Sequence, residues 1–289
     1  MKMFNTSSAP PDIPSNKTLS HNSKSLHVIL IALYSVNLAG GIAGIIVMSR
    51  LLFQRNIQSV MTTIIINLMV VHSILLFSLP FRLTYYISFE WKFGWFTCKA
   101  FSGMIYAHMY ITFIFYVAIV IIRLLRLEFQ RWHTKTWITA VWLVGLVIIF
   151  PIFLSYYGSS KTYNYSKCFQ FHRGMQEEGM IIANYCFIGI LVATVSALSL
   201  IQLAVIFQLA MKYWPDMNSH MEFRAQMKSF FFIVVILICF VPHHAFRIYY
   251  IQNFTLEDET NLTLYNEIFL ALTALCCLDL LCFIAGIAH

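Results

Sequence analysis

Long apolar runs alternate with short polar segments along the chain. Each run holds about 20 or more mostly apolar residues, the length that an α-helix needs to cross a bilayer. The linkers between them are too short for a folded soluble domain. Seven runs qualify, at approximately residues 27–50, 60–87, 99–125, 136–156, 179–210, 224–251 and 265–287. The pattern predicts an all-α membrane protein, a seven-transmembrane helix bundle.

The first 26 residues differ from the rest of the chain. They are polar and rich in Ser, Asn and Pro, which predicts a disordered tail. We therefore expect a tail at residues 1–26 and a single membrane domain at residues 27–289.

Composition excludes a water-soluble protein. Apolar residues make up 60% of the chain and charged residues only 11%, whereas a soluble domain carries about 25% charged residues. The net charge of +7 could indicate a nucleic-acid partner. However, the basic residues lie in short segments between apolar runs, so we interpret them as loop and membrane-interface charges. We expect the lipid bilayer as a partner, and no nucleic acid.

Glycosylation sequons indicate the orientation, because Lys and Arg are divided almost evenly between the two sides. With an extracellular N-terminus, every Asn-x-Ser/Thr triplet falls in the tail or an outer loop. We therefore predict a plasma-membrane, multi-pass glycoprotein with its N-terminus outside. The candidate sites are Asn5, Asn16, Asn164, Asn253 and Asn261, with Asn5 and Asn16 best placed.

The seven cysteines fall into two groups. Cys98 and Cys168 lie on the oxidising outer side, so a disulfide is the natural interpretation and two free thiols are the alternative. The other five lie within apolar runs, where they are expected to act as small hydrophobic residues. These five are Cys186, Cys239, Cys276, Cys277 and Cys282.

Several short motifs occur together in a characteristic order. Arg123 ends the third run, and Trp142 and Pro151 lie in the fourth. The remaining motifs are NL at 67–68 followed by His72, WKFG at 91–94 before Cys98, CFVP at 239–242 and LDLLCF at 278–283. Their order and spacing resemble the rhodopsin-like G-protein-coupled receptors over nearly the whole chain. The runs LPFRLTYYI, FRIYY and YNEIFL are especially similar to one orphan member.

The chain also departs from the family pattern. The third-helix triplet reads IRL at 122–124, without the usual acid and tyrosine, and the fifth helix lacks the usual proline. The chain ends at His289, so no eighth helix is expected. The other departures are Gly41, His72, Phe240, Asp279, Leu280 and Phe283, which replace Asn, Asp, Trp, Asn, Pro and Tyr in that order.

The resemblance implies a switch at the inner side. Arg123 would contact a G protein; the alternative is an arginine that only reaches the interface. Glu222 would hold Arg123 at rest, or else is a solvated acid at a helix start. Pro242 should kink the sixth helix, with Phe240 packing below it and Phe283 at the tyrosine position of the seventh helix.

The resemblance also implies an outer ligand pocket. His244 and Arg247 follow Pro242 in a pattern similar to purinergic and lipid-mediator receptors, and Arg82 and Lys99 would add positive charge near the rim. Arginine suits carboxylate or phosphate groups. The alternative is that these residues anchor in the headgroup layer. No acid occurs at residues 100–112, which argues against an amine ligand.

A polar pair is expected in the middle of the bundle. Family members commonly hold a sodium ion there, through an acid at the position of His72. Asp279 takes a facing position, so we predict a direct or water-bridged His72–Asp279 contact, with Thr112 and His108 nearby. The alternative is a neutral His72 bonded to a backbone carbonyl.

We therefore expect a receptor that transmits an extracellular signal, such as an anionic lipid or nucleotide, to heterotrimeric G proteins, with arrestin as a further candidate partner. A non-coupling decoy, scavenger or heteromer partner is the alternative, and a channel or transporter a remote one. No zincin spacing, nucleophile elbow or phosphate loop occurs, which argues against an enzyme. No cofactor or metal is expected.

Overall fold

The computed structural model describes residues 16–55, 59–125, 131–149, 168–169, 178–253 and 259–281. All regular structure within these residues is helical. The α-helices are α1 (Asn16–Arg55), α2 (Val60–Ser88), α3 (Trp95–Leu124), α4 (Arg131–Leu143), α6 (Glu178–Lys212), α7 (Met221–Cys239), α8 (Val241–Asn253) and α9 (Glu259–Thr273). The π-helix η1 (Val144–Ile149) continues α4, and η3 (Met217–Ser219) and η4 (Ala274–Leu278) are 3-10 helices.

Six stretches of these helices are long and apolar enough to cross a membrane, and each matches a predicted run. They are Lys24–Gln54, Val60–Ser88, Trp95–Leu124, Ile181–Lys212, Met221–Asn253 and Leu262–Leu281. The predicted run at 136–156 coincides with α4 and η1 as far as Ile149, and its remainder lies outside the described residues. The predicted all-helical membrane fold is confirmed. α1 begins at Asn16 and so includes the last part of the tail that the sequence predicts to be disordered.

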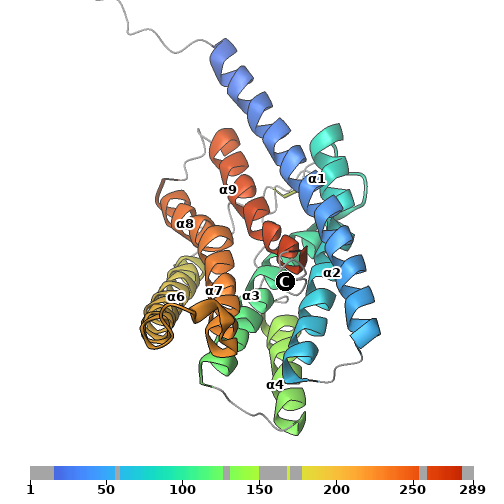
Figure 1. Cartoon of the computed structure of the whole chain (residues 1–289). Coiled ribbons are helices and arrows are strands. Elements are labelled where there is room, and N and C mark those ends of the chain that lie inside the picture. The colour runs from blue at the N-terminus through green and yellow to red at the C-terminus, as the bar shows by residue number, and fades with distance from the viewer. Residues whose placement is uncertain are drawn as a thin grey trace, which may run out of the picture.

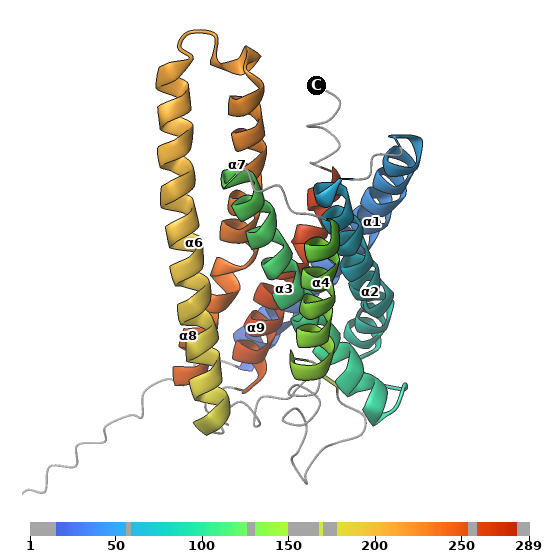
Figure 2. The same cartoon turned by 90° about the horizontal axis from the view of Figure 1, so that it is seen from below.

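The helices form one bundle with α3 and the last span at its centre (Figure 1, Figure 2). In the most apolar part of these two spans 56% and 61% of the residues are buried, against 22% for α6. Neighbouring pairs include α1 with α2, α2 with α3, α3 with α7, α6 with α7, and both α1 and α8 with α9. Side chains of the central helices therefore meet residues from several elements at once.

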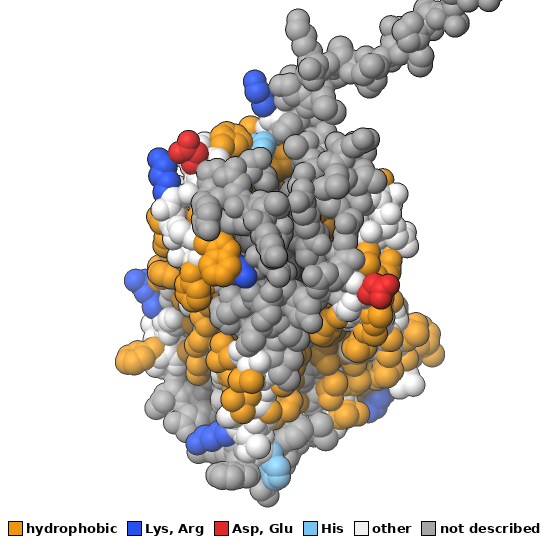
Figure 3. All heavy atoms as spheres, turned by 180° about the vertical axis from the view of Figure 1, so that it is seen from behind, with side chains coloured by type: hydrophobic (Ala, Val, Ile, Leu, Met, Phe, Trp, Pro, Cys, Tyr) orange, Lys and Arg blue, Asp and Glu red, His pale blue; other side chains and the backbone are white. Residues whose placement is uncertain are grey.

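The outside of the bundle is apolar. Phe77, Leu200 and Ile238 are each more than 60% exposed, and hydrophobic side chains cover much of the described part of the face in Figure 3. A water-soluble protein rarely exposes such a continuous apolar surface. In a bilayer, this surface faces lipid tails.

Two glycines let α1 approach the last span closely. A Cβ atom on Gly40 would overlap the side chain of Leu278, and one on Gly44 would lie 3.2 Å from Leu280 Cβ. These glycines are four residues apart and share one face of the helix, a spacing that favours close packing of membrane helices. α1 therefore packs directly against η4.

A break separates α7 from α8. Pro242 has no backbone N–H and its ring clashes with the preceding turn of a helix, and α7 ends at Cys239 before α8 begins at Val241. The ring of Phe240 is fully buried there, with centroids 6.3 Å from Phe113 and 6.2 Å from Tyr116. The interruption lies where the sequence predicts a kink.

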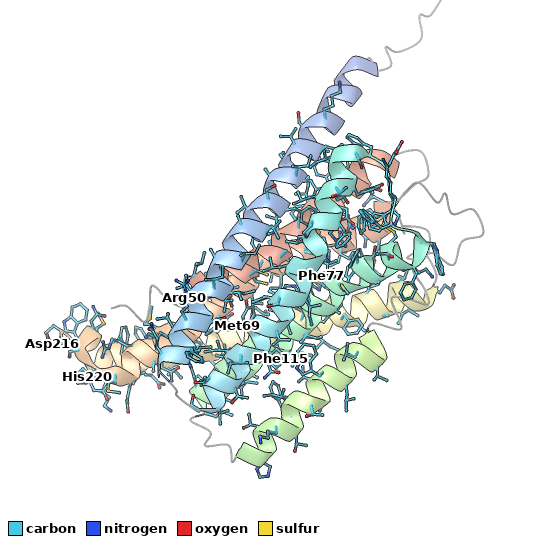
Figure 4. All side chains as sticks on the ribbon, turned by 90° about the vertical axis from the view of Figure 1, so that its right-hand side faces the viewer. Arg50, Met69, Phe77, Phe115, Asp216 and His220 are labelled. Carbon is cyan, nitrogen blue, oxygen red and sulfur yellow. A yellow bond between two sulfur atoms is a disulfide. The ribbon has the colours of Figure 1, made fainter. Side chains whose placement is uncertain are left out.

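The two ends of the bundle are marked by the ends of α3. Cys98, in its first turn, is bonded to Cys168, with the two Cα atoms 5.8 Å apart. This disulfide confirms the prediction from the two outer cysteines. We call this end the disulfide end and the opposite one, where α3 finishes, the Arg123 end. Asp216 and His220, in the connection from α6 to α7, lie far from the N-terminal end of α1 (Figure 4).

Candidate functional site

A buried ion pair links α2 to α9 in the disulfide half. Arg82 Nη1 donates to Glu267 Oε2 at 3.1 Å and to Tyr34 Oη at 3.2 Å, and Nη2 donates to the Phe101 carbonyl at 3.2 Å. The guanidinium carbon lies 4.2 Å from the centre of the Phe169 ring. The sequence placed Arg82 near the rim of a positive pocket. The structure instead buries it against a carboxylate.

Glu267 is a residue that the sequence analysis missed. An acid within an apolar run is costly at membrane depth, and such residues commonly pair with one another or serve a function. The acid within the apolar run YNEIFL is the sequence signal that points to this residue. Tyr34 also donates to Glu267 Oε2, at 3.3 Å, so three helices meet at this carboxylate.

Arg247 connects α8 to three other helices. Its Nη1 donates to Tyr106 Oη on α3 and to Asn266 Oδ1 on α9, and its Nε donates to Asn184 Oδ1 on α6, each at 3.3 Å. Only 3% of the residue is exposed, so the side chain lies within the bundle and not among lipid headgroups. Asn266 precedes Glu267, so Arg82 and Arg247 meet consecutive residues of α9.

The other two predicted pocket residues contact different groups. His244 is buried, and its Nδ1 lies 2.9 Å from the Phe240 carbonyl oxygen at the helix break. The Lys99 ammonium lies 4.2 Å from the centre of the Trp95 ring in the first turn of α3. Arg82 and Arg247 therefore contact neighbouring residues of α9, whereas His244 and Lys99 lie against backbone and aromatic groups.

A lateral cavity of about 250 Å³ lies elsewhere, between α2, α3 and α4. Its lining contains no charged side chain, and Ile64, Val117 and Trp137 are typical members. This cavity therefore does not suit an anionic ligand.

Asp279 and His72 meet in the middle of the bundle. His72 Nε2 lies 3.5 Å from Asp279 Oδ1, and both side chains are buried. Tyr116 Oη donates to Asp279 Oδ2 at 2.7 Å and lies 3.4 Å from the Cys276 carbonyl. The structure thus brings together the pair that the sequence predicts and adds Tyr116, which the sequence analysis did not identify. Thr112 is also buried, and its hydroxyl has no hydrogen-bond partner within the described part of the chain.

The other side of His72 faces a second histidine and two thiols. Its Nδ1 lies 2.9 Å from His108 Nε2 and 3.4 Å from Cys277 Sγ. His108 Nε2 lies 3.7 Å from Cys277 Sγ and 4.0 Å from Cys276 Sγ. The sequence analysis assigned both cysteines to apolar packing, which is incomplete because their sulfur atoms face the two imidazoles.

The helical bundle, the disulfide at the start of α3 and the polar centre agree with one family. Residues 43–279 match the family model described as 7 transmembrane receptor (rhodopsin family). This chain belongs to that family. The receptor is therefore a multi-pass protein of the plasma membrane and not an enzyme, as the sequence predicts.

Known relatives of the receptor are similar over most of its length. Human "Probable G-protein coupled receptor 141" is 41% identical over 270 residues, which are 90% of this chain and 88% of the relative. Mouse "Probable G-protein coupled receptor 34" is 25% identical over 253 residues, 83% of this chain and 68% of that protein. "Lysophosphatidic acid receptor 5" of Bos taurus is 26% identical over 256 residues, 82% of this chain and 66% of that protein.

Two motif residues of the receptor join α2 to α4. Trp142 Nε1 donates to Asn67 Oδ1 at 2.9 Å. Asn67 also donates to the Thr63 carbonyl of its own helix at 2.8 Å, which fixes the amide orientation. Two of the motif residues that the sequence singles out, Asn67 and Trp142, are therefore in direct contact.

The predicted latch is not formed at the Arg123 end. Within the described part of the receptor, Arg123 makes no ion pair with Glu222, and its buried Nη1 has no hydrogen-bond partner. Glu222 Oε2 instead accepts a hydrogen bond from Tyr213 Oη at 3.1 Å. Gln226, one turn further along α7, donates to the Arg123 carbonyl at 3.4 Å and accepts from Gln202 at 2.9 Å. Amides rather than charges link α3, α6 and α7 here.

Several predicted sites lie outside the described residues. These are Phe283, Asn5 and Asn164, together with the side chains of Asn16 and Asn261. Asn253 is described: it ends α8, is exposed, and donates to the Tyr249 carbonyl at 2.9 Å.

Proposed function

We propose that the receptor transmits the binding of an extracellular anionic small molecule, of lipid or nucleotide class, to a heterotrimeric G protein. The observation that carries this proposal is Arg247, whose guanidinium is held inside the disulfide half by side chains from α3, α6 and α9. Intramembrane ionisable residues are rare and commonly mark functional sites.

Arg247 gives the site both selectivity and a mechanical connection. A guanidinium binds carboxylate or phosphate by paired charge-assisted hydrogen bonds, which are stronger than those to neutral oxygens. An arriving anion would therefore compete with Tyr106, Asn184 and Asn266 for the same donors. Exchange of these partners changes how α8 is held against three helices. Because α8 meets α7 at the Phe240 break, the change is passed towards the Arg123 end.

A relative supports the ligand class. By its name, the bovine relative is a receptor for lysophosphatidic acid, which carries a phosphate on a lipid chain. That chemistry fits an arginine inside a mostly apolar bundle. The two orphan-type relatives carry no ligand in their names, so the class rests on Arg247 and this one distant similarity.

Coupling is tested without a ligand. Cells that express the receptor are assayed with a panel of second messengers, next to cells that express Arg123→Ala at equal surface level. We expect basal activity in at least one pathway and its loss in the variant, because Arg123 ends α3 where a G protein would dock. Silence of both proteins in every pathway would favour the non-coupling alternative, a decoy or heteromer partner.

The ligand class is tested separately by direct binding. Purified receptor is titrated with a panel of lysophospholipids and nucleotides, alongside Arg247→Ala, Arg247→Lys and Lys92→Ala. Lys92 is the matched control, since it is an exposed cation that pairs with exposed Glu90 at 3.8 Å. We expect binding that Arg247→Ala reduces at least tenfold, that Arg247→Lys partly restores and that Lys92→Ala leaves unchanged. Equal binding by all four proteins would overturn the role of Arg247.

A further inference from the structure

Four buried side chains in the middle of the bundle converge on one point. His72 comes from α2, His108 from α3, and Cys276 and Cys277 from η4. One nitrogen of each imidazole and both sulfur atoms all lie within 4.8 Å of one another, and each residue is at most 2% exposed. Two imidazoles and two thiols are the donor set of tetrahedral structural zinc sites.

The spacing of the donor atoms fits a tetrahedral metal ion. Zinc bonds nitrogen at about 2.0–2.1 Å and sulfur at about 2.3 Å, so ligand atoms around it lie about 3.3–3.8 Å apart. The separations are 2.9 Å between His72 Nδ1 and His108 Nε2, and 3.4, 3.7 and 4.0 Å for three nitrogen–sulfur pairs. The remaining donor pairs lie within 4.8 Å, so shifts of up to about 1 Å would complete the coordination.

The outer partner of His72 also fits a metal ligand. Metal-bound histidines usually donate their second N–H to a carboxylate, which fixes the ring and raises its basicity. Here His72 points Nδ1 at the cluster and Nε2 at Asp279 Oδ1, 3.5 Å away. Asp279 is in turn held by Tyr116 at 2.7 Å. The residues present would therefore form a chain of contacts from the metal to His72, then to Asp279 and then to Tyr116.

Hydrogen bonding alone leaves this cluster poorly satisfied. Two neutral histidines share only one proton between His72 Nδ1 and His108 Nε2. Among the described residues, His72 Nε2, His108 Nδ1 and Asp279 Oδ1 have no hydrogen-bond partner, although buried polar atoms normally have one. A metal ion would accept the lone pairs of His72 Nδ1 and His108 Nε2 together, so neither nitrogen would need a proton. Both outward nitrogens then carry protons, and that of His72 is directed at Asp279.

We propose that the receptor binds one zinc ion, or a similarly soft metal ion, through His72 Nδ1, His108 Nε2, Cys276 Sγ and Cys277 Sγ. Binding displaces the two thiol protons to solvent, so the divalent charge is balanced by two thiolates inside the membrane. Nitrogen and sulfur donors select zinc or copper(I) over sodium, magnesium and calcium. The ion would tie α2 and α3 to η4, so it would hold the centre of the bundle in one arrangement.

The test measures metal in the whole receptor. Receptor expressed in zinc-supplemented cells is purified in nanodiscs, washed with a weak chelator and analysed for metal content by mass spectrometry. We expect about one zinc per wild-type receptor and loss of this zinc in Cys277→Ser. Cys186→Ser, which changes an exposed cysteine of α6, is the control and should retain the metal. Zinc that stays in Cys277→Ser would be bound elsewhere, for example to exposed histidines, and would overturn the proposal.

Cobalt(II) gives a second readout, which the wild-type receptor already provides without any variant. In the wild-type receptor, cobalt in place of zinc should show thiolate-to-metal charge transfer, and its intensity should fall by about half in Cys276→Ser, which keeps one thiolate. Asp279→Asn should retain the site but weaken zinc binding about 10–100-fold. Folded wild-type receptor with neither zinc nor a cobalt–thiolate band would refute the site. This result is independent of the ligand class and of G-protein coupling.

Discussion

Among single residues, the polar groups inside the bundle are each held by specific buried partners. Arg82 and Glu267 neutralise each other, Arg247 is held by neutral side chains from three helices, and His72 lies between Asp279 and two thiols. Each arrangement places charged or polar atoms where lipid and protein exclude water. Removing one partner is therefore costly, because the other remains buried.

The first prediction concerns the Arg82–Glu267 pair. Glu267→Gln should destabilise the receptor by about 3–5 kcal/mol, because the Arg82 charge loses its buried partner. Thermal unfolding in nanodiscs measures the effect. Glu178→Gln, which changes an exposed acid of α6, is the control and should be near neutral. Adding Arg82→Met to Glu267→Gln should recover part of the lost stability. A melting temperature of Glu267→Gln equal to that of the wild type would contradict the buried charge pair.

The second prediction concerns the Arg123 end. Because no ion pair joins Arg123 to Glu222 among the described residues, Glu222→Ala should leave basal signalling unchanged. Gln226→Ala should raise it, since Gln226 bonds both the Arg123 carbonyl and Gln202 and so links α3 to α6 and α7. The measurement is second-messenger output at matched surface expression. If basal signalling rose in Glu222→Ala but not in Gln226→Ala, the result would instead support the Arg123–Glu222 ion pair that the sequence suggests.

Among the helices and their connections, the break between α7 and α8 is the feature on which the proposed signal transmission depends. It separates the half-helix that carries Arg247 from the half-helix that packs on the end of α3. Pro242 prevents the backbone hydrogen bond that would make the two halves continuous. The fully buried Phe240 contacts α3 at the break, so rotation of α8 is coupled to the packing of α7.

The third prediction tests this break. Pro242→Ala should raise thermal stability, because an internal proline costs a helix about 3 kcal/mol, and should lower basal signalling because the two half-helices become one rigid rod. Pro80→Ala is the matched control, since Pro80 also lies inside a membrane helix. It should raise stability without lowering signalling. Equal signalling by both variants and the wild type would show that the break is not a hinge.

At the scale of the whole molecule, the central position of α3 and the last span determines where chemistry can occur. These two spans are the most buried, and both polar sites lie between them and their neighbours. The disulfide holds one end of this centre by joining the start of α3 to Cys168. The bundle thus combines an apolar exterior for lipid with a polar interior that runs from Arg82 towards Asp279.

The fourth prediction concerns the disulfide. Cys98→Ser should reduce surface expression severalfold and destabilise the receptor by about 2–5 kcal/mol, the usual effect of losing a native disulfide. Cell-surface labelling against total protein measures the first effect and thermal unfolding the second. Cys168→Ser should behave the same way, and the double variant should add little, because either change removes the same bond. Clearly additive losses would mean that the two cysteines act separately.

The fold class is readable from the sequence alone, because runs of about 20 apolar residues have few alternatives to spanning a bilayer as helices. It also predicted the disulfide, since only Cys98 and Cys168 lie outside the apolar runs. The His72–Asp279 pair followed from the family resemblance, which supplied a proximity that spacing along the chain does not contain.

The partners of the buried groups follow from the packing of the helices. Glu267 lies 185 residues from Arg82, and Cys277 lies 205 residues from His72, so no local pattern relates them. Adjacent cysteines such as Cys276 and Cys277 do not form a zinc motif in sequence; they become metal ligands only where α2 and α3 bring two imidazoles to η4. For the same reason, the sequence could not tell that Glu222 accepts a hydrogen bond from Tyr213 and makes no ion pair with Arg123 among the described residues. Helix packing sets the distance between side chains, and the residue types fix only what they can do once they meet.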